Sequence, residues 1–434
     1  GGFFVRDALE RLGIRADLVR IGDYKSAPES YTRNEPTDIG RAQRQGLIDD
    51  QFERLLAAVG SARQIPRPQL AALIDGGPLT AQRALAARLV DAVATGEQAE
   101  AQIREAVGEG LPLTPLDSGP EHAQSYAPPG IAVVQIHGDI AGGTSREVPW
   151  VNIRTAGADT IVSALETAAR DPQVRAIVVR IDSPGGSATA SDVIARQLFE
   201  VAKRKPVVCS LGDVAASGGY YAAAPCAVIF ANPSTITGSI GIFGGKVDVS
   251  GLLTMLGVRR VTYSRGAHAD QESFYRPYTD AERENVRQGL QQSYERFLDT
   301  VARGRRMTLA DVDQRGQGRV FSGQQALGQR LVDHVGGFID AVAEARRRGG
   351  LDPDGASPLF YYPQRPTTIL GQLLGLLPGL GGADGDEALR SSAMPTDLLQ
   401  TLAGDLLPGL RAALLLLETE TLARLPFDAP ATRP

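Results

Sequence analysis

The stretch DTIVSALETAARDPQVRAIVVRIDSPGG, Asp159 to Gly186, contains a helix pattern, a strand pattern and a glycine-rich loop in direct succession. Apolar residues recur at helical spacing over 159–170, whereas 174–181 is a short apolar run typical of a buried strand. Further buried strands are predicted on both sides of this stretch, at 131–136, 206–212 and 227–231. Strands that alternate with helices at this interval predict an α/β fold of layered β-sheets with flanking helices. Ligands are then expected at the carboxyl ends of the strands.

The chain also repeats part of its own sequence. LGIRADLVRIGDYKSAPESY (12–31) aligns without gaps with LGVRRVTYSRGAHADQESFY (256–275), at an offset of 244. QRALAARLVDAV (82–93) aligns with QQALGQRLVDHV (324–335), at an offset of 242. Repeated supersecondary units indicate a duplicated architecture. We therefore predict that residues 1–115 are the back half of one domain, whose front half is missing here, and that 131–350 are a complete copy.

The segments between and after the two copies differ from them in composition. Residues 116–130 lie in a stretch rich in Pro, Ser and Gly, which is typical of a linker. Residues 351–434 form a Leu/Pro/Gly-rich C-terminal tail in which LLPGL occurs twice. The uncharged run 366–383 contains two prolines and five glycines, so it is a poor candidate for a membrane span.

Composition excludes several classes of function. The 434 residues include 45 basic and 50 acidic side chains. The basic residues are scattered among the acidic ones and form no block, so nothing indicates binding to nucleic acid. The two cysteines, Cys209 and Cys226, fall in predicted strands or strand edges, so we expect neither a disulfide framework nor a metal site. The first residue is Gly1 and no signal segment follows it, so we expect the sequence to be part of a longer gene product.

Two glycine-rich loops that follow predicted strands are candidates for chemistry. They are DSPGGSATAS (182–191) and DVAASGGYY (213–221), and the second contains Ser217. Glycines at such places allow a substrate backbone to approach and leave backbone N–H groups free to stabilise negative charge. Ser217 is therefore a candidate nucleophile, although a plain connection or a phosphate-binding loop would have the same pattern.

A serine nucleophile needs a base, and the histidines do not supply an obvious one. None of the four, at positions 122, 137, 268 and 334, lies in a recognisable catalytic context. A lysine can replace histidine if burial lowers its pKa. The repeat aligns Lys25 with Ala269, so one copy could carry the lysine and the other the serine. The alternative is that Lys25 is a solvated surface lysine.

These motifs together resemble a known family. DSPGGSA, DVAASGGYY and ANPSTITGSIGIFG (231–244), with DYKSAPES (23–30) upstream, resemble signal peptide peptidase A of the long, duplicated bacterial type over residues 1 to about 350. The resemblance implies tandem domains similar to the Clp protease subunit and the crotonase superfamily, the first copy being incomplete. It also implies a serine protease with a Ser/Lys dyad. The roles that it implies are Ser217 as nucleophile, Lys25 as general base, Ser239 as the residue that orients the lysine, and the N–H groups of Gly218 and of Gly186 or Gly185 as the oxyanion hole.

The resemblance has further implications for substrates and location. It implies hydrolysis of signal peptide remnants and other hydrophobic peptides without a cofactor or metal. It also implies a homo-oligomer, for which we expect a tetramer. It also implies an N-terminal membrane anchor, absent here, that holds the catalytic domain on the periplasmic side of a bacterial inner membrane.

Three other interpretations remain open. A Ser-His-Asp protease expects a histidine where Ile242 stands. A crotonase-like acyl-CoA enzyme would use the glycine N–H pair without a nucleophile. A non-catalytic membrane-associated scaffold would need neither Ser217 nor Lys25.

Overall fold

A computed structural model of the chain describes residues 2–94, 96–107, 128–148, 153–263, 265–266, 268–363 and 422–424. These residues form two compact units. One consists of Gly1–Arg44 together with Ala127–Pro434, and the other is Gln45–Tyr126. The first unit therefore contains both Lys25 and Ser217.

The larger sheet of the first unit has eight strands, and nearly all adjacent pairs are parallel. Only β10 and β12 pair in antiparallel fashion. The predicted strands at 131–136, 174–181, 206–212 and 227–231 are all present. The path runs through β12 (Val320–Ser322), β10 (Ile236–Gly238), β8 (Val207–Ala216), β6 (Val174–Ser183), β2 (Gly130–His137) and β14 (Leu359–Tyr362), with β9 (Val228–Ala231) beside β8 and β13 (His334–Val335) beside β9.

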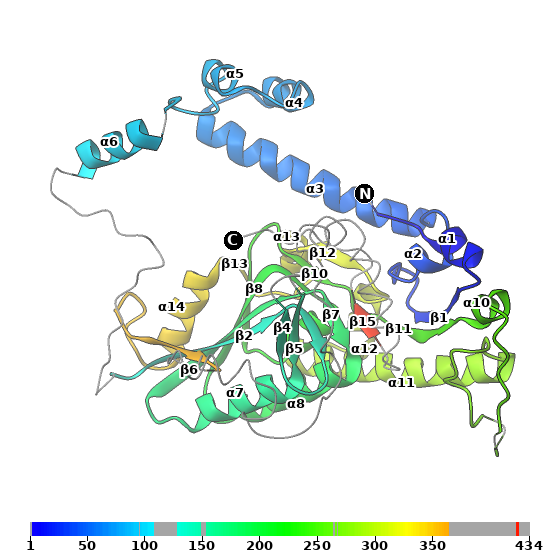
Figure 1. Cartoon of the computed structure of the whole chain (residues 1–434). Coiled ribbons are helices and arrows are strands. Elements are labelled where there is room, and N and C mark those ends of the chain that lie inside the picture. The colour runs from blue at the N-terminus through cyan, green and yellow to red at the C-terminus, as the bar shows by residue number, and fades with distance from the viewer. Residues whose placement is uncertain are drawn as a thin grey trace. The chain divides into compact units, whose positions relative to one another are not determined.

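Helices cover both faces of this sheet, as Figure 1 shows. Along β6, Ile177 and Val179 belong to the core cluster that also contains residues of α7 (Ala158–Arg170) and α8 (Ala188–Ala202). The intervening Val178 belongs to a second cluster with α14 (Phe338–Arg348). Successive side chains of a strand point to opposite faces, so an apolar run without alternation is what two covered faces require. The predicted α/β layered fold is confirmed.

The second sheet brings the N-terminal segment to the rest of the first unit. Its first strand, β1, pairs antiparallel with β11 over seven residues, although more than two hundred residues separate them. β15 is antiparallel to both of its neighbours, and β3 is parallel to β5 and β7. The order is β1 (Arg15–Ile21), β11 (Ile242–Asp248), β15 (Leu422–Arg424), β7 (Gly185–Ser187), β3 (Asp139–Ala141), β5 (Ile153–Gly157) and β4 (Arg146–Val148).

The internal repeat is visible in the helices. α1 (Arg6–Arg11) and α10 (Ser250–Met255) lie 244 residues apart, and three later pairs lie 242 apart at their starts. Those pairs are α3 (Asp38–Arg63) with α11 (Asp280–Arg305), α4 (Arg67–Asp75) with α12 (Leu309–Arg315), and α5 (Ala81–Ala86) with α13 (Gly323–Gly328). β1 is the exception, because the described residues of its counterpart, 259–263 and 265, are neither helix nor strand. The domain boundaries at 115, 130 and 350 stay predictions, and the tail 351–434 falls largely outside the described residues.

The unit Gln45–Tyr126 is helical where the structure describes it. It contains most of α3, the short helices α4 and α5, and α6 (Gly96–Val107). Its small core is formed by Leu56, Ile65 and Leu70. No helix among the described residues of the whole chain is both long and apolar enough to cross a membrane. The uncharged run 366–383 is not among them.

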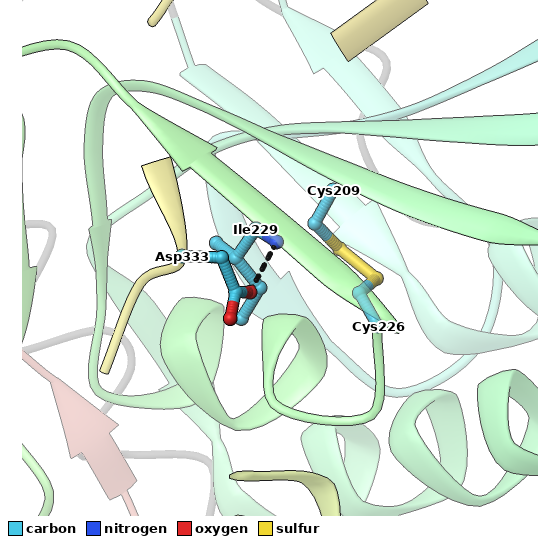
Figure 2. The surroundings of a disulfide bond; sticks show 4 residues. All are labelled: Cys209, Cys226, Ile229 and Asp333. Carbon is cyan, nitrogen blue, oxygen red and sulfur yellow. Dashed lines mark hydrogen bonds between the residues drawn. A yellow bond between two sulfur atoms is a disulfide. The ribbon is translucent and has the colours of Figure 1, made fainter. Parts of the chain in front are cut away.

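The prediction that the two cysteines form no disulfide is wrong, because Cys209 and Cys226 are bonded to each other (Figure 2). Cys209 lies in β8 and Cys226 lies two residues before β9. β8 and β9 are parallel neighbours, and the helix between them returns the chain, so the two Cα atoms are 5.7 Å apart. The spacing of 17 residues has no local motif. Only the return of the chain through that helix makes the bond possible.

Candidate active site

Ser217 lies at the junction between β8 and the short helix α9 (Gly218–Ala223), where it is the N-cap residue. It has no exposed surface. Its φ of 54° is unusual for a residue with a side chain, and such strain is often found at functional sites. The Ser217 N–H donates to the carbonyl oxygen of Gly238 on β10 at 2.8 Å, which holds this backbone in place. The turn thus directs one small hydroxyl into the protein interior.

Lys25 lies in the turn between β1 and α2 (Glu29–Thr32). The Tyr24 N–H donates to the carbonyl oxygen of Gln317 at 2.8 Å. At Gly318, whose φ is +82°, an added Cβ would lie 2.5 Å from Lys25 N, so only glycine fits there. The β1–β11 pairing and this close packing together carry Lys25 to the end of β8. Lys25 is not the surface residue that the alternative interpretation assumed, because it has no exposed surface.

The Lys25 amine contacts two serines. Its Nζ lies 2.7 Å from Ser217 Oγ, 3.0 Å from Ser239 Oγ and 3.2 Å from the Ser239 carbonyl oxygen. Burial lowers the pKa of Lys25 well below its usual range, because the charged form loses hydration. Ser239 follows β10 directly and has a φ of 53°, so both serines that face the amine have strained backbones. The structure therefore brings together all three side chains that the sequence singled out.

The predicted glycines lie beside Ser217. Gly185 and Gly186 form the start of β7, with φ values of +107° and +151°. A Cβ added to Gly218 would lie 3.2 Å from Gly186 N and 2.5 Å from Ser191 Oγ, so the start of α9 touches β7. As the first residue of α9, Gly218 has an N–H without a partner inside the helix. Two backbone segments with N–H groups thus meet next to the Ser217 hydroxyl.

The histidines among the described residues lie elsewhere. His137 Nδ1 is 3.9 Å from Asp182, His268 Nδ1 is 3.8 Å from Glu282, and the His334 ring packs against Phe230. Ile242, where a Ser-His-Asp enzyme would need its base, is the first residue of β11. His122 is outside the described residues. No histidine that the structure describes is in contact with Ser217.

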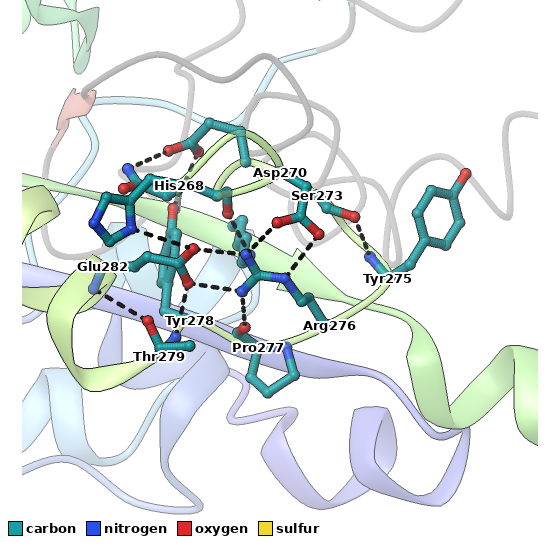
Figure 3. A network of polar contacts seen from close by, with 12 residues as sticks. His268, Asp270, Ser273, Tyr275, Arg276, Pro277, Tyr278, Thr279 and Glu282 are labelled. Atoms are coloured by element: carbon teal, nitrogen blue, oxygen red, sulfur yellow. Dashed lines mark hydrogen bonds and ion pairs between the residues drawn. The ribbon is translucent and has the colours of Figure 1, made fainter. Parts of the chain in front are cut away.

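A second buried lysine was missed by the sequence reasoning. Lys246 on β11 has no exposed surface, and its Nζ donates to the Gln271 carbonyl oxygen at 2.5 Å and lies 4.2 Å from the Tyr278 ring centroid. Tyr278 is part of the polar network of Figure 3, in which Arg276 bridges Asp270 and Glu282. This network packs on the β1–β11 pair, because the Tyr278 N–H donates to Asp17 of β1 at 2.9 Å. No motif marks these residues in the sequence, since they converge from β1, β11 and the loop before α11.

Comparison with known proteins is consistent with this geometry. Peptidase family S49 matches residues 1–109 and 200–352, which is more than half of the chain. The chain is 35% identical over 382 residues to Protease 4 of Salmonella typhi, an alignment that covers 85% of this chain and 60% of that protein. It is 29% identical over 385 residues to the chloroplastic serine protease SPPA of Arabidopsis thaliana, covering 86% of this chain and 56% of that protein.

A third relative has a more specific name. The chain is 34% identical over 191 residues to the putative signal peptide peptidase SppA of Enterococcus faecium, which covers 44% of this chain and 56% of that protein. The chain thus spans less than two thirds of the length of these relatives. The family match extends over both the segment with Lys25 and the segment with Ser217. This chain belongs to Peptidase family S49.

Proposed function

We propose that this protein is a serine peptidase in which Ser217 is the nucleophile and Lys25 is the general base. The observation that carries the proposal is the buried 2.7 Å contact between Lys25 Nζ and Ser217 Oγ. A serine hydroxyl needs an adjacent base to react at neutral pH, and an amine is a base only when it is unprotonated. Burial lowers the pKa of Lys25, which supports a neutral amine at the working pH.

The hydrogen-bonding capacity of a neutral amine matches the partners around it. Such an amine has two N–H donors and one lone pair. The Ser239 carbonyl oxygen and Ser239 Oγ can accept the two N–H groups, since they lie 3.2 Å and 3.0 Å from Lys25 Nζ. The lone pair is then directed at the Ser217 hydroxyl, which donates to it. In this arrangement Ser239 positions the base and takes no part in bond making.

The reaction follows from these positions. Ser217 Oγ attacks the peptide carbonyl carbon while its proton passes to Lys25 Nζ. The N–H groups of Gly218 and Gly186 hold the oxyanion. Gly185, the other glycine that the sequence indicated, donates its N–H to Ser183 Oγ at 3.2 Å, which favours Gly186. Lys25 then returns the proton to the leaving amine as the C–N bond breaks. A water molecule, deprotonated by Lys25, hydrolyses the acyl-enzyme and frees Ser217.

We propose that the substrates are apolar peptides, including remnants of signal peptides. The name of the Enterococcus faecium relative supports this substrate class, and so do the small apolar residues Ala215, Ala216 and Ala222 around the serine. The acyl-CoA alternative would require the glycine N–H groups alone. The close contact between Lys25 and Ser217 favours the peptidase, because an enolate-stabilising site needs no activated serine.

We further propose a homo-oligomer, a tetramer, associated with a bacterial inner membrane on its periplasmic side. The Cys209–Cys226 disulfide supports an oxidising compartment, because such bonds are rare where thiols are kept reduced. Light scattering of the purified protein tests the assembly. A monomeric mass at micromolar concentration would contradict it.

A fluorophosphonate probe, which labels activated serines, tests the peptidase. We expect labelling and peptide hydrolysis by the wild type, and neither by Ser217→Ala. The matched control is Ser191→Ala, because Ser191 is also buried close to Gly218 but its hydroxyl donates to the Ser187 carbonyl oxygen at 2.8 Å. That control should keep its labelling. Labelling of Ser217→Ala at the wild-type level would refute Ser217 as the nucleophile. Absence of labelling in the wild type would favour the scaffold interpretation.

A further inference from the structure

A short strand from the C-terminal tail fills a slot in the second sheet. β15 pairs antiparallel with β7, with Leu422 opposite Ser187, Ala423 opposite Gly186 and Arg424 opposite Gly185. On its other side Leu422 lies opposite Phe243 of β11. Figure 1 shows β15 in red between these two strands. Without it, β7 and β11 would each present an open edge, and the seven-stranded sheet would separate into two pieces.

Both edges of this slot belong to the candidate active site. β7 begins with Gly185 and Gly186, the predicted oxyanion residues. β11 begins three residues after Ser239, which contacts the lysine amine. β15 is also in contact with α9, the helix that starts immediately after Ser217. A chain in this slot therefore pairs with the two glycines and contacts the helix that starts after Ser217.

The slot has room for one strand only. Neighbouring strands are about 4.8 Å apart, so two strands that both pair with a third are separated by twice that distance. Recognition by main-chain hydrogen bonds on two sides is the means by which a sheet accepts an extended peptide of varied sequence. An extended substrate and β15 would need the same backbone donors and acceptors and cannot bind together.

We propose that residues 422–424 are a built-in ligand of the peptide-binding slot between β7 and β11, and that they compete with peptide substrates. The inference rests on the proposed peptidase function, which defines the competing ligand. A tethered segment is present at a high effective concentration, so even weak pairing lowers the apparent affinity for a free peptide. The apparent KM rises in inverse proportion to the fraction of molecules in which the slot is open.

The test changes the backbone of β15 in the full chain. Because β15 lies between β7 and β11, its backbone N–H groups donate to one or the other of these strands. Ala423→Pro removes one of those N–H groups and so weakens the pairing. Ala423→Ser keeps that N–H and is the matched control. If β15 fills the slot in nine molecules of ten, we expect Ala423→Pro to lower the KM for a fluorogenic apolar peptide about tenfold with kcat unchanged. Ala423→Ser should behave as wild type, and a chain that ends at residue 417 should behave as Ala423→Pro.

Addition of a synthetic peptide with the sequence 418–429 should inhibit the truncated chain competitively. The same peptide methylated on the Ala423 nitrogen should inhibit it less. A second readout does not depend on hydrolysis. In the Ser217→Ala background, the amides of residues 185–187 and Phe243 should exchange hydrogen faster when Ala423→Pro is added.

The outcomes separate the two proposals. If wild type, Ala423→Pro and the truncated chain have equal KM values and equal rates of amide hydrogen exchange, the proposal that β15 is a built-in ligand is wrong. Faster exchange without hydrolysis by any variant would support the ligand and count against the peptidase.

Discussion

Lys25 and Lys246 both have no exposed surface, but different groups surround their amines. Lys25 faces two hydroxyls and a carbonyl oxygen, and burial alone sets the shift that lowers its pKa well below the usual range. Burial and the nearby Arg276 charge also lower the pKa of Lys246, but the carboxylates of Glu282, Glu272 and Asp17 oppose that shift. Burial by itself therefore does not make a base. An amine becomes one where no carboxylate stabilises its charge and a hydroxyl lies within reach.

The largest expected effect is the loss of activity in Lys25→Met. Without the amine, the Ser217 proton has no acceptor, so kcat/KM for an apolar peptide should fall by about 10⁴-fold or more. The measurement is steady-state hydrolysis, with circular dichroism to verify folding. The contrasting variant, Lys246→Met, should keep kcat within about threefold wherever it is folded, because a group outside the reacting set loses no transition-state contact. Equal losses in both would erase the distinction between the two lysines.

The pH dependence sharpens the comparison further. When the chain unfolds, Lys25 regains its ordinary pKa of 10.5, above its folded value. Between these two values the unfolded state binds more protons, so the free energy of unfolding rises with pH and the buried amine costs stability at neutral pH. We expect Lys25→Met to be more stable than wild type at pH 7, with a gap that narrows toward pH 10. Urea unfolding at several pH values measures this, and a gap independent of pH would contradict it.

Ser239 should have a smaller effect on activity. Ser239→Ala removes the hydroxyl 3.0 Å from Lys25 Nζ but keeps the carbonyl contact, so the amine is less well positioned. We expect kcat to fall about 10- to 100-fold, at the low end for a general-base contribution. Ser239→Gly is the control for the backbone, since glycine adopts the φ of 53° without strain. Activity retained in both variants would show that the hydroxyl has no positioning role.

Lys246→Met should act on stability. It removes a buried hydrogen bond to Gln271 and a contact with the Tyr278 ring, and it leaves nearby carboxylates with less compensation. The free energy of unfolding should fall by about 1–3 kcal/mol. Urea unfolding at pH 7 measures the change. Stability equal to wild type would mean that the network around Arg276 holds the β1–β11 pair without the lysine.

The smallest effect is expected at an exposed lysine. Lys203 pairs with Glu200 at 2.7 Å, and both side chains are more than 60% exposed. Solvent screens such pairs, so many contribute nothing measurable. Lys203→Met should match wild type in hydrolysis and in urea unfolding, and it serves as the control for both buried lysines. A clear loss of stability there would show that removal of any lysine charge perturbs this chain.

Several features of the site could be predicted from the sequence because they depend on local pattern. Alternating strands and helices place the loops after β6 and β8 at one edge of the sheet, and their small residues indicate close backbone approach. That reasoning indicated the two glycine-rich loops and made Ser217 a candidate nucleophile, while the family resemblance assigned the roles of Ser217, Gly218, Gly186 and Gly185. Local pattern alone does not identify Lys25 as a candidate base, since nothing in its neighbouring residues distinguishes it from a surface lysine. The internal repeat and the family resemblance identified Lys25 as the candidate.

The remaining features depend on partners distant in the sequence. The aligned segments 12–31 and 256–275 have similar sequences, but only the first contains a strand, because β11 pairs with it and no described strand pairs with the second. The Cys209–Cys226 bond, the position of Lys246 and the insertion of β15 likewise arise from chain segments that meet only after folding. Hydrophobic periodicity shows which face of an element is buried, but not which segment covers it. The sequence by itself therefore determined the fold class and the position of the serine loop, because both depend on local pattern. Tertiary pairing decided the surroundings of the lysine and the occupant of the slot, because both depend on segments that meet only after folding.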